Sequence, residues 1–476
     1  MSWQPLTELA QDLRSGKCTA TELTKRALDQ LKASQEYNAI ISTNGDAMER
    51  AAEVDKGIAS GKYNSPLAGV PYIAKDNFLT AGIKTTAASN ILSDFIPPYS
   101  ASAISRLDEA GAILIGKANL DSFAHGSSTE NSDMGPTLNP HDKLRVPGGS
   151  SGGSAAAVVL DIVPFALGTD TGGSIRLPAS FTGSVGYKPT YGLVSRYGVV
   201  AMASSTDVIG PLTSRVEDAA IVLDTLASRD PLDATSIESD PHGYVSLSSD
   251  LKGKTIGVVK EYMGEGVSDE VRDSVLAAVE LAKASGAEIK EVSMPTLDTA
   301  LAVYYIVMPA EVSSNLSRYD GIRYGHTSDK AESIDQVYEL SRTEGFNDEV
   351  KRRIMVGTYV LSSGYYDAYY KKAQAVRTLL IKSFVEAFEE VDFLLGPTSP
   401  TTAFKLGENT SDPLQMYLAD IMTVAANLVG VPAISIPCGK GEGGLPIGLQ
   451  LIAPQRHDLE LLGVAHGFEQ KLGYLS

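Results

Sequence analysis

Residues 146–178 read VPGGSSGGSAAAVVLDIVPFALGTDTGGSIRLP and contain two turns rich in glycine and serine. Glycine lets backbone N–H groups turn inward and approach a ligand closely. A serine held among such N–H groups can act as a nucleophile, with the N–H groups as an oxyanion hole beside it. The two turns lie close enough in the sequence to face one pocket. The stretch therefore predicts a site for acyl transfer.

Length and charge limit the classes of protein to which the chain can belong. Its 476 residues are enough for about three average domains, although single α/β domains reach this size. Hydrophobic residues make up 43% and charged residues 21%, as in ordinary globular proteins. The formal net charge of -18 argues against a chain that binds the phosphate backbone of a nucleic acid by itself. Any nucleic acid involved is expected to be carried by a partner.

The cysteines and the apolar runs indicate a cytoplasmic protein. The two cysteines, Cys18 and Cys438, have no CxxC spacing, which argues against a disulfide framework or a thiolate metal site. The first residues, MSWQPL, lack the basic and apolar segments of a signal peptide, so none is expected. Charges such as Asp161 break the longest apolar runs, and we expect no membrane-spanning helix.

Strand and helix patterns alternate along the chain. A capping box at Thr19 and Glu22 predicts the start of a helix. Hydrophobic periodicity predicts strands at 70–74, 112–115, 255–259, 288–292, 392–395, 433–436 and 447–452, and helices at 102–110, 269–284 and 459–472. The alternation predicts an α/β fold with a large mixed central β-sheet covered by helices on both faces. The polar segment 230–250 is interpreted as a surface connector inside one domain, 1–476, with two lobes.

One interpretation of the glycine–serine turns is a phosphate cradle, because glycine-rich turns at helix starts bind anions. Neither turn has the lysine of a P-loop in the required place. The nearest Gly-Lys-Thr, at 253–255, lacks the earlier glycine because position 248 is Ser248. A nucleotide site is therefore weakly supported.

A second interpretation is the nucleophile elbow of an α/β-hydrolase. Both 148–152 and 149–153 satisfy GxSxG. The elbow requires a strand that runs directly into the turn, and the sequence RVP at 145–147 is a poor strand end. The elbow also requires a late histidine, for which His457 and His466 are the candidates. A chance match is common in such turns, so this interpretation is also weak.

A third interpretation combines the serines with Lys75, which follows the apolar run VPYIA at 70–74. A lysine carried into the interior by such a strand loses hydration, and this lowers its pKa. The resulting neutral amine can act as a base. A single lysine is ordinarily a solvated surface charge, but the preceding strand and the serine turns favour a buried one.

Three segments together resemble the amidase signature family: 69–77 (GVPYIAKDN), 148–155 (GGSSGGSA) and 170–178 (DTGGSIRLP). The resemblance implies the amidase signature fold and a catalytic unit Ser–cis-Ser–Lys. It also implies a signature core at about 65–215 and a substrate-side lobe at about 251–430.

The resemblance assigns roles to individual residues. Ser174 is the nucleophile, Ser150 follows a cis peptide bond and relays the proton, and Lys75 is the terminal base. Ser151 and Ser154 are interpreted as hydroxyls that support the turn. Backbone N–H groups would form the oxyanion hole, from Thr171, Gly172, Gly173 and Ser174.

Later segments resemble a narrower group, the A subunits of the bacterial tRNA-dependent amidotransferases. These segments are 188–192 (KPTYG), 194–198 (VSRYG), 315–325 (NLSRYDGIRYG), 349–354 (EVKRRI) and 361–374 (LSSGYYDAYYKKAQ). The resemblance implies a glutaminase that passes ammonia to a B subunit, where ATP and Mg²⁺ serve to amidate Glu-tRNA(Gln) or Asp-tRNA(Asn). A C subunit would complete a heterotrimer, and tRNA would bind mainly through the B subunit. No metal or cofactor would bind to this chain.

Two other functions stay open. One is a free-standing amidase that hydrolyses other small amides, which the acidic composition does not exclude. The other is a catalytically inactive scaffold for a B subunit. The presence of Lys75, Ser150 and Ser174 argues against a scaffold.

Glutamine carries an α-ammonium and an α-carboxylate, so its pocket needs a fixed anion and a fixed cation far from the nucleophile. Arginine suits the carboxylate because its fork binds both oxygens. By motif position the resemblance assigns the carboxylate to Arg353, the ammonium to Asp420 and the pocket wall to Tyr304. From the residues alone, Arg353 and Asp420 would instead be surface charges and Tyr304 a core aromatic.

Three positions depart from the usual pattern of the A subunits. Leu177 and Val208 stand where glutamine is usual, and His125 stands where methionine is common. None of these changes removes a catalytic group, although they bear on the fit of the substrate. We interpret His125 as a packed or hydrogen-bonded histidine rather than a titrating group.

Overall fold

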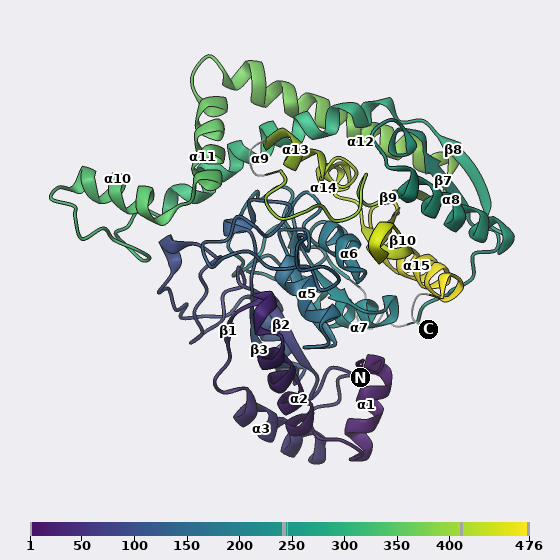
Figure 1. Cartoon of the computed structure of the whole chain (residues 1–476), viewed down its shortest axis with the longest axis horizontal. Helices are drawn as coiled ribbons and strands as arrows, with labels where there is room; N and C mark the ends of the chain where they lie inside the picture. Colours follow the sequence, from purple (N-terminus) through teal and green to yellow (C-terminus); the bar gives the residue numbers. More distant parts are fainter. Residues whose placement is uncertain (1, 240–243, 245, 410–412, 474–476) are drawn as a thin grey trace.

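The computed structural model describes residues 2–239, 244, 246–409 and 413–473 (Figure 1). Within these residues, eleven strands form one sheet in the order β1-β3-β2-β4-β6-β5-β10-β11-β9-β7-β8. The strands are β1 (Ile40–Thr43), β2 (Pro71–Lys75), β3 (Ile113–Ala118), β4 (Phe165–Asp170), β5 (Val185–Lys188), β6 (Val208–Thr213), β7 (Thr255–Val259), β8 (Glu288–Val292), β9 (Phe393–Pro397), β10 (Ala433–Lys440) and β11 (Pro446–Ile452).

The sheet is mixed, as expected. β3, β2 and β4 run parallel, and so do β9, β7 and β8, whereas antiparallel pairs join the strands between these two groups. A parallel pair needs a crossover connection, and α8 (Asp269–Ala284) supplies it between β7 and β8. The bounds of this strand–helix–strand unit agree with those predicted from the sequence.

Helices surround the sheet. The other α-helices are α1 (Leu6–Ser15), α2 (Ala20–Ala33), α3 (Ala47–Ala59), α4 (Ser102–Glu109), α5 (Gly152–Val159), α6 (Arg176–Thr182), α7 (Val216–Leu226), α9 (Ala300–Asn315), α10 (Ile334–Gly345), α11 (Asp348–Leu361), α12 (Lys372–Glu390), α13 (Pro413–Leu418), α14 (Val424–Val429) and α15 (Asp458–Leu472). A π-helix, η7 (Tyr366–Lys371), leads into α12. α10 projects away from the rest of the molecule, and α11 stands beside its base (Figure 1).

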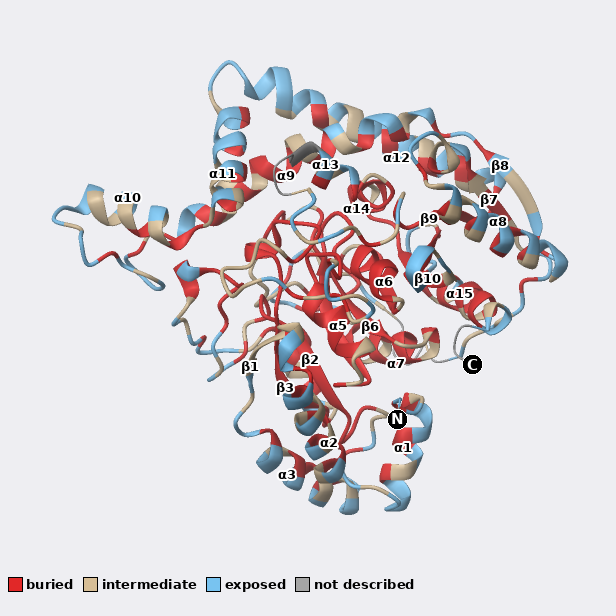
Figure 2. Cartoon of the chain, in the orientation of Figure 1, coloured by how far each residue is buried: buried red, intermediate tan, exposed pale blue. Residues whose placement is uncertain are grey.

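Apolar cores lie on both faces of the sheet. In β9, Phe393 and Leu395 belong to a core that includes α2, α7, α8 and α15. Leu394, between them, belongs to a second core with α9, α11, α12 and α14. Successive residues of a strand point to opposite faces, so helices cover both faces, as predicted. Figure 2 shows the central strands as buried.

Local sequence signals account for several element boundaries. The capping box is confirmed, because Thr19 Oγ1 accepts from the N–H of Glu22 at 3.1 Å and the Glu22 carboxylate accepts from the N–H of Thr19 at 2.9 Å. The patterns did not indicate β1, β4, β5 or β6, nor helices α9 to α12. The described part of 230–250 has no helix or strand, and residues 240–243 and 245 lie outside the described residues.

A buried ion pair fixes the segment that follows β2. Lys117 Nζ of β3 lies 3.0 Å from Asp76 Oδ1, and both side chains are excluded from solvent. Lys117 Nζ also donates to Phe78 O at 2.7 Å and to Thr85 Oγ1 at 3.0 Å. Asp76 accepts a further bond from the N–H of Thr86 at 2.8 Å. The end of β2 is therefore tied to β3 by charge as well as by the sheet.

Replacing Lys117 by methionine would leave Asp76 buried without its cation. We expect Lys117→Met to lower the free energy of unfolding by about 3–5 kcal/mol, as for other broken buried pairs. Urea denaturation measures this change. Lys84→Met is the control, because the pair of Lys84 with Asp94 is exposed and should contribute little. Similar losses in the two variants would contradict the structural role of the buried pair.

Candidate active site

Lys75 lies at the carboxyl end of β2 and is fully buried. Its Nζ donates to Ser150 Oγ at 2.7 Å, to Ser151 Oγ at 2.9 Å and to Thr169 Oγ1 at 3.0 Å. Thr169 belongs to β4, which pairs with β2 in parallel, so both strands end at the same edge of the sheet. The structure thus brings Lys75 together with Ser150, from the first serine turn.

Burial changes the protonation of Lys75. It lowers the pKa of the amine to about 7, although the carboxylates of Asp121, Asp170 and Asp207 favour the charged form. A substantial share of the amine is then neutral at neutral pH, with a lone pair that can accept a proton from a hydroxyl. The direction of the shift agrees with the prediction from the sequence.

The turn that carries Ser150 has no room for larger side chains. The peptide bond between Gly149 and Ser150 is cis, as the family resemblance implies. A Cβ at Gly149 would overlap the carboxylate of Asp121 and would lie 2.6 Å from Ser128 N. Glycine is the residue that allows this close approach. α5 begins directly after the turn.

An ion pair holds the turn that carries Ser174. Asp170 accepts from Arg176 Nε at 3.0 Å and from Arg176 Nη2 at 2.9 Å, and both side chains are fully buried. Arg176 also donates to Gln450 and Asn427, each at 2.6 Å. Burial raises the pKa of Asp170, but Arg176 outweighs this effect and the pKa falls to about 2. The paired charges therefore fix both ends of the turn.

The two serine turns contact each other. The N–H of Ser151 donates to the carbonyl of Ser174 at 3.1 Å. Ser174 is 8% exposed, whereas Ser150 is fully buried. The described residues show the bond between Lys75 and Ser150 but none between the hydroxyls of Ser150 and Ser174. The structure thus places all three expected residues in one region, with one link of the expected relay formed.

The expected oxyanion hole needs a correction at Gly173. The N–H of Gly173 donates to Asp170 Oδ1 at 2.8 Å, so this amide is already used. The φ angle of Gly173 is 139°, a conformation that favours glycine, and a Cβ there would overlap the Thr423 hydroxyl. The described residues provide no acceptor for the other three expected amides. Of the four expected donors, those without an acceptor among the described residues are therefore the amides of Thr171, Gly172 and Ser174.

Tyr304 and Asp420 lie beside this turn. A Cβ at Gly172 would be 2.6 Å from Tyr304 Cζ, so the ring of this α9 residue lies against the turn. Asp420 follows α13 and accepts from Ser127 Oγ at 2.7 Å and from the hydroxyl of Tyr305 at 3.2 Å. Burial raises the pKa of Asp420 to about 7. Tyr304 is thus a buried aromatic that also contacts the Ser174 turn.

A short link joins Asp420 to the turn of Ser174. Thr423, three residues after Asp420, donates from Oγ1 to the carbonyl of Gly172 at 2.6 Å. The same hydroxyl lies 3.0 Å from the carbonyl of Asp420. The anion is therefore held at a set position relative to the turn of Ser174.

Arg353 lies on the inner side of α11 and is only 4% exposed. Its Nε donates to Glu349 Oε1 at 2.7 Å. The rings of Tyr305 and Tyr417 lie 5.4 and 5.2 Å from its guanidinium carbon. Arg353 and Asp420 both contact Tyr305, so the cation and the anion face one region. The alternative of two surface charges is wrong.

Two of the unusual positions have packing roles. Leu177 is fully buried in a small apolar cluster with Val146. Val208 is the partner of Asp170 where β6 pairs with β4. Neither position places a new polar group in the site.

His125 is a packed and hydrogen-bonded histidine, as interpreted from the sequence. It is fully buried, and its Nδ1 lies 3.2 Å from the carbonyl of Ser122. Burial, with the charge of Arg353 as a second cause, lowers its pKa to about 3. The ring is therefore neutral at neutral pH.

Sequence patterns missed several residues of the site. Ser151 was expected only to support the turn, yet it also contacts Lys75. Thr169 could be inferred only from the parallel pairing of β2 with β4, and Ser127 only from the tertiary structure. The one signal for the buried ion pair is that Asp170 and Arg176 flank a glycine turn within an apolar region.

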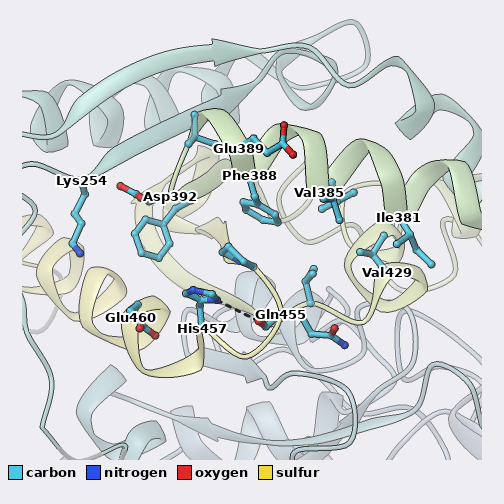
Figure 3. A pocket seen from close by; sticks show the side chains of 15 residues that line it. Lys254, Ile381, Val385, Phe388, Glu389, Asp392, Val429, Gln455, His457 and Glu460 are labelled. Atoms are coloured by element: carbon cyan, nitrogen blue, oxygen red, sulfur yellow. Dashed lines mark hydrogen bonds between the residues drawn. The ribbon is translucent and has the colours of Figure 1, made fainter.

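A separate pocket of about 440 Å³ lies beside α12 (Figure 3). Its lining includes Ile381, Val385, Phe388, Lys254 and His457, and none of the expected site residues. Across the described part of the chain, no group of three or more His, Cys, Asp and Glu side chains is placed to hold a metal ion. No helix among the described residues is long and apolar enough to cross a membrane.

Comparisons with known proteins agree with the motifs. The amidase family profile matches residues 22–462. The A subunit of glutamyl-tRNA(Gln) amidotransferase from Thermoanaerobacter pseudethanolicus is 54% identical over 466 residues, 97% of this chain and 95% of the relative. Its counterpart in Geobacillus thermodenitrificans is 52% identical over 98% of this chain and 97% of the relative.

Solved structures also match. The crystal structure of the glutamyl-tRNA(Gln) amidotransferase A subunit from Thermotoga maritima has a TM-score of 0.79 and 40% identity, over 95% of this chain and 91% of that one. The peptide amidase of Stenotrophomonas maltophilia has a TM-score of 0.82 and 28% identity, over 99% of this chain and 97% of that one. The chain therefore belongs to the amidase family, and the resemblance to amidotransferase A subunits indicated by its motifs is confirmed.

Proposed function

We propose that this chain is the glutaminase subunit of a tRNA-dependent amidotransferase. Relatives that are named as A subunits of glutamyl-tRNA(Gln) amidotransferase match it over almost its whole length. One observation carries the proposal: Thr423 links the Ser174 turn to the segment of a buried anion, Asp420, and this anion and a buried cation, Arg353, both contact Tyr305. Free glutamine has an amide at one end and opposite charges at the other, which suits this arrangement.

Catalysis begins with proton transfer. The neutral amine of Lys75 takes a proton from Ser150, and Ser150 takes one from Ser174 as Ser174 Oγ attacks the amide carbon of glutamine. The carbonyl oxygen becomes an oxyanion, which the N–H groups of Thr171 and Gly172 stabilise. The C–N bond then breaks, a proton returns through Ser150 to the leaving nitrogen, and ammonia departs. Ser174 is left as the γ-ester of glutamate.

Hydrolysis of this ester uses the same groups. Water loses a proton through Ser150 to Lys75 and attacks the ester carbon. The C–O bond to Ser174 breaks, Ser174 regains a proton, and glutamate leaves. The relay requires a hydrogen bond between the hydroxyls of Ser174 and Ser150.

Two charged groups orient the substrate. The Nη groups of Arg353 bind the α-carboxylate, because Nε is already used by Glu349; Nη1 has only a weak contact at 3.7 Å with the sulfur of Met308. Asp420 binds the α-ammonium, and this cation favours the ionised form of a carboxylate whose pKa burial has raised to about 7. Tyr304 closes the wall next to Gly172. The amide of glutamine then faces Ser174.

A partner subunit uses the released ammonia as its substrate. In this proposal a B subunit uses ATP and Mg²⁺ to amidate Glu-tRNA(Gln), or Asp-tRNA(Asn), and a C subunit completes a heterotrimer. The net charge of -18 supports the binding of tRNA mainly through the B subunit. Cys18 and Cys438 are both free thiols, which supports a place in the reducing cytoplasm.

A free-standing amidase is the second candidate, favoured by the structural likeness to a peptide amidase. Such an enzyme would turn over many small amides without a partner. Comparing glutaminase activity of the chain alone with that of the chain bound to B and C subunits separates the two candidates. Activity that rises sharply only in the complex supports the amidotransferase.

Ser174→Ala tests whether this chain only releases ammonia from glutamine while the B subunit amidates the tRNA. In the complex, this variant should lose the formation of Gln-tRNA(Gln) from glutamine and retain its formation from ammonium chloride, because free ammonia needs no acyl-enzyme. Amidated tRNA is the product to measure. Ser154→Ala is the matched control, since Ser154 donates to Leu167 O at 2.9 Å in the same turn region and should keep both activities. Loss of both activities in Ser174→Ala would contradict the proposal.

The pH dependence of glutamine hydrolysis follows from the protonation of two groups. Lys75 must be neutral and Asp420 must be ionised, and each has a pKa of about 7. The kcat/KM for glutamine should therefore rise from about pH 6 to about pH 8 and then level off. Asp420→Asn removes one titration, so its KM should be higher while its kcat still rises through about pH 7. A kcat that is independent of pH in this range would exclude Lys75 as the base.

Arg353→Lys tests the carboxylate site. Lysine keeps the charge but loses the fork, so KM for glutamine should rise about tenfold or more with a smaller change in kcat. Arg352→Lys is the matched control, because the neighbouring side chain is 47% exposed and should leave KM unchanged. Steady-state kinetics of both variants measure these KM values. Equal KM values in the two variants would contradict the assignment of the α-carboxylate to Arg353.

A further inference from the structure

Large side chains of α11 and of the segment that leads into η7 are exposed, and together they are here called the tyrosine face. Its members are Met355, Val356, Tyr359, Tyr365, Tyr366 and Tyr369. Met355 is 69% exposed, and each of the others is at least 38% exposed. α11 and the start of α12 are largely exposed in Figure 2. Clustered apolar side chains of this kind mark contact with another molecule.

The rings of the tyrosine face contact one another. The ring centroids of Tyr359 and Tyr365 lie 4.3 Å apart, and Tyr369 lies 6.1 Å from each of them. Tyr366 stacks on Tyr370 at 5.2 Å. Rings held in this way lose little conformational freedom when a partner covers them.

The charge around the tyrosine face is positive, in contrast to the whole chain. Residues 349–382 contain seven Lys and Arg but two Asp and Glu, whereas the chain has a net charge of -18. Some of these charges are paired: Glu349 pairs with Arg352 and Arg353, Lys351 pairs with Asp348 just before this range, and Asp367 pairs with Lys371. Lys372 has no ion-pair partner among the described residues. A complementary surface would therefore carry acidic groups.

A protein fits the tyrosine face better than RNA. Base stacking on a protein requires open aromatic faces, and these rings already contact one another. Met355 and Val356 add aliphatic surface, for which RNA has no counterpart. Tyrosine, methionine and arginine are the residues enriched at the centre of protein–protein interfaces.

The helix that carries the tyrosine face also carries the pocket cation. Arg353 lies on its inner side, and Gly357 packs so closely on Pro309 of α9 that a Cβ would overlap the Pro309 carbonyl. α9 in turn holds Tyr304 against the Ser174 turn. A partner on the outer side of α11 would thus contact the helix whose inner side carries Arg353 and packs on α9.

We propose that the tyrosine face is the docking surface for the subunit that receives the ammonia, through an acidic and apolar surface of that subunit. This inference rests on the proposed function. Binding there covers Met355 and the exposed rings and places the receiving subunit on the helix that orients glutamine. The glutamine pocket and the docking surface are then two sides of one helix.

Met355→Glu tests the docking surface. The side chain is exposed and helical, so glutamate keeps the fold and adds an anion to a face that attracts anions. Leu276→Glu is the matched control, on the exposed side of α8 (44% exposed) at the far end of the molecule in Figure 1. Calorimetry with the purified B–C pair should show at least about tenfold weaker binding for Met355→Glu. Leu276→Glu should bind like the unaltered chain, and Lys372→Glu should weaken binding most at low salt.

Each result has a distinct meaning. Equal affinities of Met355→Glu and Leu276→Glu would overturn the docking surface and leave the proposed function standing. Failure of the unaltered chain to bind the B–C pair would overturn both. If Met355→Glu kept the affinity for the B–C pair but reduced binding of tRNA to the complex, the face would serve RNA and this inference would be wrong.

Discussion

The burial of the Lys75 amine is the constraint on which the site depends. An interior ammonium loses hydration at a cost of several kcal/mol, which hydrogen bonds to Ser150, Ser151 and Thr169 offset in part. The same loss brings the pKa to about 7 and makes the amine a base at neutral pH. Parallel pairing of β2 with β4 is what carries Lys75 and Thr169 to one edge of the sheet. The pairing of β2 with β4 therefore both builds the sheet and places the buried amine of Lys75 beside its hydrogen-bond partner Thr169.

The remaining parts of the site come from distant segments that are held by buried polar contacts. Asp170 and Arg176 fix the turn of Ser174, and Thr423 ties that turn to the segment of Asp420. Each contact satisfies charges or donors that would be costly to bury alone. The Ser174 turn is thus held in place by buried polar contacts. The expected substrate residues Tyr304 and Arg353 come from α9 and α11, and α11 also carries the tyrosine face.

Local signals in the sequence predicted the unit β7–α8–β8 and the capping box at Thr19, because these elements depend on nearby residues. The patterns did not indicate β4, which lies in a run of apolar residues that periodicity cannot assign. Motifs located Lys75 and both serine turns. They could not show that Gly173 donates to Asp170 or that Arg353 is buried, since both facts depend on packing between distant segments.

The titration of Lys75 is the most direct test of this account. In a chain labelled with ¹³C at lysine Cε, the resonance that disappears in Lys75→Met reports the amine, and its shift can be followed against pH. We predict a pKa of about 7 for this group. A pKa near the ordinary lysine value of 10.5 would mean that the amine stays charged at neutral pH and cannot act as the base.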